Sequence, residues 1–340
     1  MKQKFKNMSD TNLLLFITIV TFVLMYVLAV CCLGGGFTKP QSFFDLLNEN
    51  AALIILACGL SLVMITGSID ISVGGIIALV SMSGAVYLEK ANGNVFVSLL
   101  IALGIGLVFG AFQGYLIAYL EIQPFIVTLA GMFLARGLTT IINRDSFNIE
   151  NNEAFKAVKN LRIEIPGLGT TNRHGIYNPA YITIGVVVAL LIVLILFCVL
   201  RWTRLGRSFY AVGGNNQSAL MLGINVKKSK FLAHLLCGLL GGIGGFVFLL
   251  NLGSGAVSNG GGFEMLAIAS AIIGGTMLTG GVGNIVGSLL GVLSLRTIQN
   301  IVRSIGLDEA WWTEITVGAM LCIFLVIQSI VMARKEKKAK

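Results

Sequence analysis

Charged residues are scarce in this chain of 340 residues: they make up 11% of it, whereas hydrophobic residues make up 56%. A soluble globular protein carries roughly a quarter charged residues, so the composition excludes an ordinary soluble domain and predicts a polytopic membrane protein. The basic excess, 24 Lys and Arg against 15 Asp and Glu, is accompanied by neither a basic-aromatic face nor a long disordered tail. These absences argue against binding to nucleic acid.

The motifs that carry catalysis are also missing. The dipeptide Gly-Lys does not occur, which excludes a P-loop for ATP, and there is no nucleophile elbow or chain of intramembrane acids. His174 and His234 have no metal-ligand neighbours in the sequence, and the six cysteines form no CxxC pair, so packing roles and free thiols are expected. No catalytic residue, cofactor or metal is therefore predicted. Any energy-consuming activity requires a partner protein.

Long apolar runs occupy most of the chain. A bilayer core about 30 Å thick needs roughly 20 apolar residues per helix, and fewer where a helix is broken or re-entrant. This rule predicts an all-α fold of about ten spans in a single transmembrane domain over 1–340, with halves at 12–142 and 179–332. The first span is too long for a signal-peptide core and is expected to be an uncleaved anchor. The expected spans are 12–33, 51–66, 71–88, 94–120, 123–142, 179–200, 228–250, 263–280, 284–305 and 311–332.

Basic residues determine the expected orientation. An even number of spans puts both termini on one side of the membrane, and the basic clusters fall on that side, which the positive-inside rule assigns to the cytosol. The sequence thus predicts cytosolic termini, a cytosolic loop at 201–226 and an external loop at 143–178. The external loop either contacts a partner or is a simple solvated loop. The basic residues are Lys2, Lys4, Lys6, Arg201, Arg204, Arg207, Lys227, Lys228, Lys230, Arg334, Lys335, Lys337, Lys338 and Lys340.

Two similar glycine-rich breaks, at 65–75 and 273–284, interrupt short spans and indicate an internal repeat. Backbone polar groups freed by a break are tolerated in a membrane only where they face protein or water, so paired breaks predict a translocation path near the repeat interface. Close packing of helices through small residues would explain the same glycines, and both interpretations stay open. The candidate path residues are Gly67, Asp70, Ser72, Gly74, Gly275, Thr276, Thr279 and Gly283.

Asp70 is the most informative single side chain. A carboxylate between two apolar stretches costs roughly 2.5–3.5 kcal/mol on insertion scales, so Asp70 needs a polar cavity, a cation or free backbone amides. It either caps the half-helix that begins at residue 72 or 73, or contacts the solute in the path. Arg136 is expected to snorkel outward or to pair with an acid such as Glu264, itself stabilised near a helix N-terminus. Glu121 is expected at a solvated helix end.

The cationic loop has a pattern of its own. Asn215 or Asn216 can cap a short helix that continues to Leu222, and Gly223 can end it in a left-handed conformation. So short a helix has no core of its own, and its small and apolar residues are expected to bury against another subunit; lying passively on the membrane surface is the alternative. The residues expected to make this contact are Gly206, Arg207, Gly214, Asn215, Asn216, Gln217, Ser218, Ala219, Leu222, Gly223 and Ile224.

At these residues the chain resembles the permease subunits of bacterial ATP-binding-cassette importers for pentoses and hexoses, the ribose, xylose, arabinose and galactoside group. Residues 125–137, the acidic stretch after them and residues 311–318 are most similar to the galactofuranose permease branch, which also resembles fructose-import permeases. Ser68 stands where the group usually has glycine, and Ser218 where it often has alanine. The matching stretches, in order over roughly 49–328, are 67–74, 124–132, 135–137, 206–225 and 273–283.

The resemblance implies a permease in the bacterial cytoplasmic membrane that pairs with an identical or related permease. It also implies cytosolic ATPase subunits, an extracytoplasmic sugar-binding protein, surrounding membrane lipid and a coupling role for 206–224. The implied substrate is a monosaccharide: a furanose-form hexose such as galactofuranose, or a related hexose or pentose. The alternatives are a self-sufficient secondary carrier or channel for a small polar solute, and a receptor or scaffold without transport.

Overall fold

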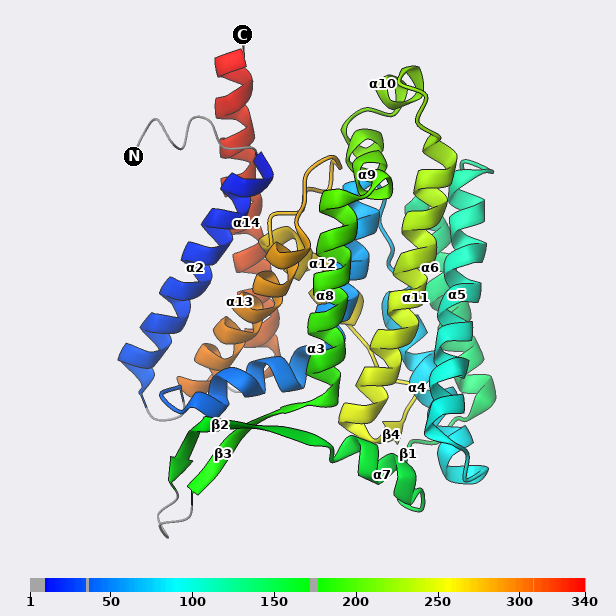
Figure 1. The fold of residues 1–340 in the computed structure, drawn as a ribbon, viewed down its shortest axis with the longest axis vertical. Coiled ribbons are helices and arrows are strands. Elements are labelled where there is room, and N and C mark those ends of the chain that lie inside the picture. Colours follow the sequence, from blue (N-terminus) through cyan, green and yellow to red (C-terminus); the bar gives the residue numbers. More distant parts are fainter. Residues whose placement is uncertain (1–9, 35–36, 172–176, 308, 340) are drawn as a thin grey trace.

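The chain forms a bundle of long helices with two small two-stranded sheets (Figure 1). The computed structural model describes residues 10–34, 37–171, 177–307 and 309–339, so that His174 lies outside the described residues. The helices are α2 (Asp10–Leu33), α3 (Pro40–Ile65), α4 (Val73–Lys90), α5 (Val95–Ala118), α6 (Pro124–Ile142), α7 (Glu153–Lys159), α8 (Ile184–Trp202), α9 (Arg204–Gly214), α10 (Asn216–Met221), α11 (Val226–Leu252), α12 (Phe263–Ile273), α13 (Ile285–Ser304) and α14 (Ala310–Ala339).

Nine of the described helices are long and apolar enough to cross a membrane, which confirms the prediction of a polytopic all-α protein. The expected span at 263–280 is wrong as a full span. It contains only α12, a half-helix of 11 residues, because the chain leaves the helical conformation at Gly274 and Gly275. The expected span at 51–66 starts earlier than predicted, since α3 begins at Pro40, which suits the first turn of a helix.

The two ends of the bundle differ in character (Figure 1). At one end, here called the α10 end, lie α9, α10, the start of α2 and the end of α14. At the opposite end, here called the hairpin end, lie α7 and the strands β2 (Arg162–Thr171) and β3 (Tyr177–Thr183). The basic residues of 201–230 therefore lie at the α10 end, as expected if that end faces the cytosol.

The segment expected as an external loop is ordered by specific contacts. β2 and β3 form an antiparallel hairpin, and β1 (Phe147–Asn148) pairs with β4 (Ser254–Gly255), which follows α11. The Glu89 carboxylate accepts hydrogen bonds from the backbone amides of Glu150 and Asn151, at 2.9 and 3.0 Å. Residues 147–151 are thus held against the ends of α4 and α11.

The buried centre of the bundle is α3, which is enclosed by α8, α11, α12 and α13. The outer helices expose apolar side chains, as membrane-facing surfaces do: Val23 on α2, Val108 on α5 and Ile323 on α14 are all more than half exposed. α5 and α11 pack closely through small residues. A Cβ atom at Gly106 would overlap the carbonyl oxygen of Gly238, so these two backbones approach as small-residue motifs allow.

Candidate translocation path and coupling surface

The two glycine-rich breaks end their helices in the same way. After α3, the Gly67 amide donates to Met64 and the Ser68 amide to Val63; after α12, the Gly275 amide donates to Ile272 and the Thr276 amide to Ala271. This pair of bonds is the Schellman motif, which requires a left-handed residue after the helix. Gly67 has φ +77° and Gly275 has φ +88°. The correspondence predicted between the two breaks is therefore present in their local geometry.

Backbone groups freed by the breaks find partners inside the protein. The Ile65 carbonyl, at the end of α3, accepts a 2.9 Å bond from the Gly281 amide in the second break. At the end of α12, Thr18 of α2 donates to the Ile273 carbonyl at 2.9 Å, and Gln328 of α14 donates to the Ile272 carbonyl at 2.7 Å. Satisfying these groups is what permits irregular backbone at membrane depth.

The last turn of α9 lies directly against both breaks. A Cβ atom at Gly213 would overlap the Ile65 carbonyl oxygen and lie 2.5 Å from the Gly281 nitrogen, so three backbone segments meet with no side chain between them. The hydroxyl of Tyr210, also on α9, donates to the Gly283 carbonyl at 2.8 Å. Burial raises the pKa of the Tyr210 phenol to about 12, so it keeps the proton that it donates. We call the contacts of Ile65, Gly213, Gly281, Tyr210 and Gly283 the glycine junction.

The first turns of the half-helix α12 and of α4 also meet. A Cβ atom at Gly74 would overlap the Glu264 carboxylate, so the missing side chain makes room for this acid beside the N-terminus of α4. Glu264 thereby lies near the positive ends of two helices. Arg136 neither snorkels nor pairs with Glu264 among the described residues: its Nη1 donates to the carbonyls of Val257 and Asn259, each at 2.9 Å. Those carbonyls belong to the irregular segment before α12, where no helix or strand supplies them with donors.

Asp70 is buried and bonded to the start of α4. Its Oδ1 accepts from the backbone amide of Ser72 at 2.9 Å and from the Ser72 hydroxyl at 2.6 Å. Asp70 therefore binds Ser72, the N-cap residue of α4, and its side chain does not cap an amide inside the helix. Its Oδ2 lies 4.0 Å from Nδ1 of His234 on α11, and both side chains are almost fully buried. The sequence does not predict that His234 lies beside Asp70, because no pattern near either residue indicates that the first break packs against α11.

Replacing Asp70 tests its contact with Ser72. Asp70→Ala removes the acceptor for the Ser72 amide and hydroxyl, and leaving buried donors without a partner costs about 1–3 kcal/mol of the free energy of unfolding. Asp70→Asn keeps a carbonyl oxygen in the position of Oδ1 and is expected to retain most of that stability. Thermal unfolding of the purified chain in detergent measures both variants. Equal loss in both would mean that the charge beside His234, rather than the contact with Ser72, stabilises this region.

The α10 region has the predicted local structure. The Asn215 side chain accepts from the Ser218 amide at 2.8 Å and caps α10, and Gly223 follows the helix with φ +76°. Ala219 is buried, whereas the three apolar residues after it are turned outward: Leu220 is 59%, Met221 88% and Leu222 77% exposed. This apolar turn, Leu220 to Leu222, is the part of α10 that is available to another protein.

A groove of about 330 Å³ runs beside the apolar turn, between the α5–α6 connection and the start of α11. Glu121 and Lys227 border it and form an ion pair of 2.9 Å, and the hydrogen bond from Lys227 lowers the pKa of the Glu121 carboxyl. Glu121 is therefore exposed, as expected, but it is paired. Asn216 and Leu220 line the groove from the α10 side, so groove and apolar turn form one continuous surface.

The predicted site residues thus form two groups. Asp70, Ser72, Gly74, Gly275, Thr276 and Gly283 are buried around the breaks, whereas Gly67 and Thr279 lie at the exposed end of the breaks, with a Gly67 Cβ position 3.7 Å from the Thr279 carbonyl. Of the predicted coupling residues, Gly206 and Ala219 are buried and Ile224 is half-buried, while the others are exposed: Arg207, Gly214, Asn215, Asn216, Gln217, Ser218, Leu222 and Gly223. Gly206 packs on the backbone of Leu200, which makes the α8–α9 elbow tight.

In the part of the chain that the structure describes, nine apolar helices and two broken spans are typical of a polytopic membrane transport protein. The chain belongs to the family described as branched-chain amino acid transport system / permease component, whose model matches residues 42–325. The resemblance noted from the sequence is confirmed at this level.

Several curated relatives match nearly the whole chain. A fructose import permease of Bifidobacterium longum is 37% identical over 317 residues, 93% of this chain and 90% of the relative. An inner membrane ABC transporter permease of Escherichia coli K12 is 37% identical over 325 residues, 94% and 93% of the two chains. The ribose import permease of the same organism is 33% identical over 305 residues, 90% of each. No solved structure matches the chain.

Proposed function

We propose that this chain is the membrane-spanning subunit of an ATP-driven monosaccharide importer whose ATPase is a separate subunit. The observation that supports this most directly is the glycine junction, which joins the surface helix α9 to both broken spans without an intervening side chain. Relatives named as fructose and ribose import permeases support a sugar as the solute. The absence of a P-loop supports a separate ATPase.

In this proposal the ATPase subunit binds the apolar turn and the adjacent groove at the cytosolic face. Closure of the ATPase on ATP displaces α10 and, through the Asn215 connection, α9. Because Gly213 contacts the Ile65 carbonyl and Gly281 of the second break directly, movement of α9 shifts the end of α3 and the second break together. That movement switches the path between outward-open and inward-open states, which is the alternating access expected of broken-helix transporters.

The residues proposed to line the path are those expected from the sequence: Gly67, Asp70, Ser72, Gly74, Gly275, Thr276, Thr279 and Gly283. Asp70 acts there by holding the start of α4, since its Oδ1 is occupied by Ser72. A second permease, identical or related, completes the path, and an extracytoplasmic sugar-binding protein docks at the hairpin end. Both termini are then cytosolic, in the inner membrane of a bacterium.

The proposed substrate is a furanose-form hexose such as galactofuranose, or a related hexose or pentose. Uptake by the reconstituted complex, with its ATPase and binding protein, tests the proposal with candidate sugars in the presence and absence of ATP. ATP-dependent uptake of a monosaccharide is the expected result. Sugar flux through the isolated chain driven by an ion gradient would instead establish a self-sufficient secondary carrier.

A further inference from the structure

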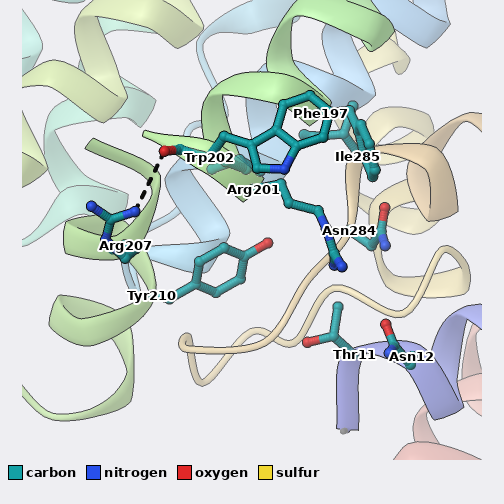
Figure 2. A pocket seen from close by; sticks show the side chains of 10 residues that line it. Thr11, Asn12, Phe197, Arg201, Trp202, Arg207, Tyr210, Asn284 and Ile285 are labelled. Carbon is teal, nitrogen blue, oxygen red and sulfur yellow. Dashed lines mark hydrogen bonds between the residues drawn. The ribbon is translucent and has the colours of Figure 1, made fainter. Parts of the chain in front are cut away.

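A cavity of about 560 Å³ opens at the α10 end of the molecule. Its walls come from the start of α2, the end of α8, α9 and the start of α13, so three regions distant in the sequence enclose it (Figure 2). Polar groups line it on several sides: Thr11 on α2, Tyr210 on α9 and Asn284 before α13. The cavity lies at the level where Trp202, 67% exposed, ends a membrane-spanning helix, and exposed tryptophans favour the membrane–water interface.

The cavity carries positive charge. Arg201 and Arg207 both line it, and no acidic residue is among its lining residues. Figure 2 shows Arg201 extending across the cavity toward Asn284. Among the side chains that the structure describes, neither arginine has an ion-pair partner; Arg207 donates only a long bond of 3.4 Å to the Trp202 carbonyl. Two guanidinium groups without an acidic partner among the described side chains favour an anion in this cavity, and guanidinium matches phosphate geometry.

An apolar stripe continues from the cavity along α8 into the membrane-spanning region. Residues 190, 194, 197 and 201 follow the spacing of one helix face. Leu190 and Leu194 therefore lie on the same face of α8 as Phe197 and Arg201, farther from the α10 end. Leu190 is 39% exposed and Leu194 is 58% exposed, whereas Phe197 lines the cavity itself. The cationic cavity is thus open to the bilayer along a surface that suits a hydrocarbon chain.

We propose that this cavity binds the headgroup of an anionic phospholipid from the leaflet at the α10 end. Arg201 contacts the phosphate, Arg207 adds positive charge at the other side of the cavity, and one acyl chain follows the stripe of Phe197, Leu194 and Leu190. Basic pockets between helices on the cytoplasmic side recognise such headgroups. A soluble phosphate ester would use the same arginines but gain nothing from the stripe, which is why the lipid is favoured. The inference requires only that the chain spans a membrane and is independent of the proposed solute.

Native mass spectrometry of the purified full chain, titrated with phosphatidylglycerol and with phosphatidylcholine, tests the site. Arg201→Gln is expected to weaken phosphatidylglycerol binding about fivefold, since one basic residue near an anionic membrane contributes on that order. Arg204→Gln is the matched control, because Arg204 is an exposed arginine of the same elbow that does not line the cavity. If the glutamine variant folds poorly, Arg201→Lys replaces it. Because lysine keeps the charge but loses the bidentate geometry of guanidinium, it is expected to weaken phosphatidylglycerol binding less than glutamine does.

Preferential binding of phosphatidylglycerol that is weakened by Arg201→Gln and unchanged by Arg204→Gln supports the proposal. Equal loss in both glutamine variants, or no preference for phosphatidylglycerol, would overturn it in favour of general surface charge. Glycerol 3-phosphate is the soluble probe: if it displaces bound phosphatidylglycerol at millimolar concentration, the site belongs to a soluble phosphate ester. The same probe is expected to leave the bound lipid in place.

Discussion

Replacing Gly213 with alanine is expected to reduce sugar uptake by the assembled transporter about tenfold or more, while Gly214→Ala leaves it near that of the unmodified protein. The added methyl group at residue 213 would overlap the Ile65 carbonyl, so α9 has to move away from both breaks. Overpacking of this kind costs typically 1–3 kcal/mol, and about 1.4 kcal/mol corresponds to a factor of ten. At residue 214 a methyl group meets nothing within 4 Å.

The pair of variants is informative because the two glycines are neighbours on one helix and differ only in what surrounds them. Uptake, ATPase activity of the complex and thermal unfolding of the chain in detergent are measured for each. If α9 transmits movement, Gly213→Ala lowers uptake per ATP hydrolysed as well as stability. Uptake per ATP that is equal in the two variants would show that the contact of α9 with the breaks does not carry the coupling.

Placing acidic side chains on the apolar turn is expected to abolish association with the ATPase. Met221→Glu with Leu222→Glu puts two charges where the chain now exposes two large apolar side chains, and both would have to be desolvated in a complex. Central apolar contacts of an interface contribute about 2 kcal/mol or more each, so losing two of them is expected to weaken affinity by roughly a thousandfold. Affinity capture of the ATPase by the permease in nanodiscs gives the measurement.

Leu168→Glu is the matched control for the apolar turn. Leu168 is an exposed apolar residue, 43% accessible, on β2 at the hairpin end, far from α10 (Figure 1). This variant is expected to bind the ATPase normally, and all variants are expected to insert into the membrane. Normal ATPase binding by the double glutamate variant would place the docking surface elsewhere on the α10 end.

Local chemistry made α10 predictable from sequence. An asparagine that caps, a short apolar helix and a glycine that ends it lie within a few residues of one another, so no distant contact is needed to form them. The equivalence of the two breaks was predictable for the same reason, since each is a helix end followed by a left-handed glycine. The half-helix α12 was harder to predict, because a hydropathy window averages its 11 residues with the break that follows and indicates one longer span.

Contacts between residues far apart in the chain could not be predicted from the sequence. Gly213 and Gly214 cannot be told apart in the sequence, yet a side chain at Gly213 would clash with Ile65 and Gly281, whereas one at Gly214 would meet nothing. His234 lies in an apolar span, and no residue near it in the sequence indicates that it approaches Asp70. Arg136 binds the carbonyls of Val257 and Asn259, in a segment whose position depends on the packing of the whole fold. In each case helix packing determines the partner, and a single sequence contains no pattern that reveals which helices pack together.

The hydrogen bond from Gly281 to Ile65 also constrains the order in which the protein is completed during synthesis. The ribosome makes α4 through α12 before it makes Gly281, so the carbonyl at the end of α3 lacks its native donor while all of these helices emerge. The end of α3 can therefore reach its final conformation only late in biogenesis. A nascent chain released before residue 281 would lack the native donor for that carbonyl, so the end of the first break is completed only when the second break has been made.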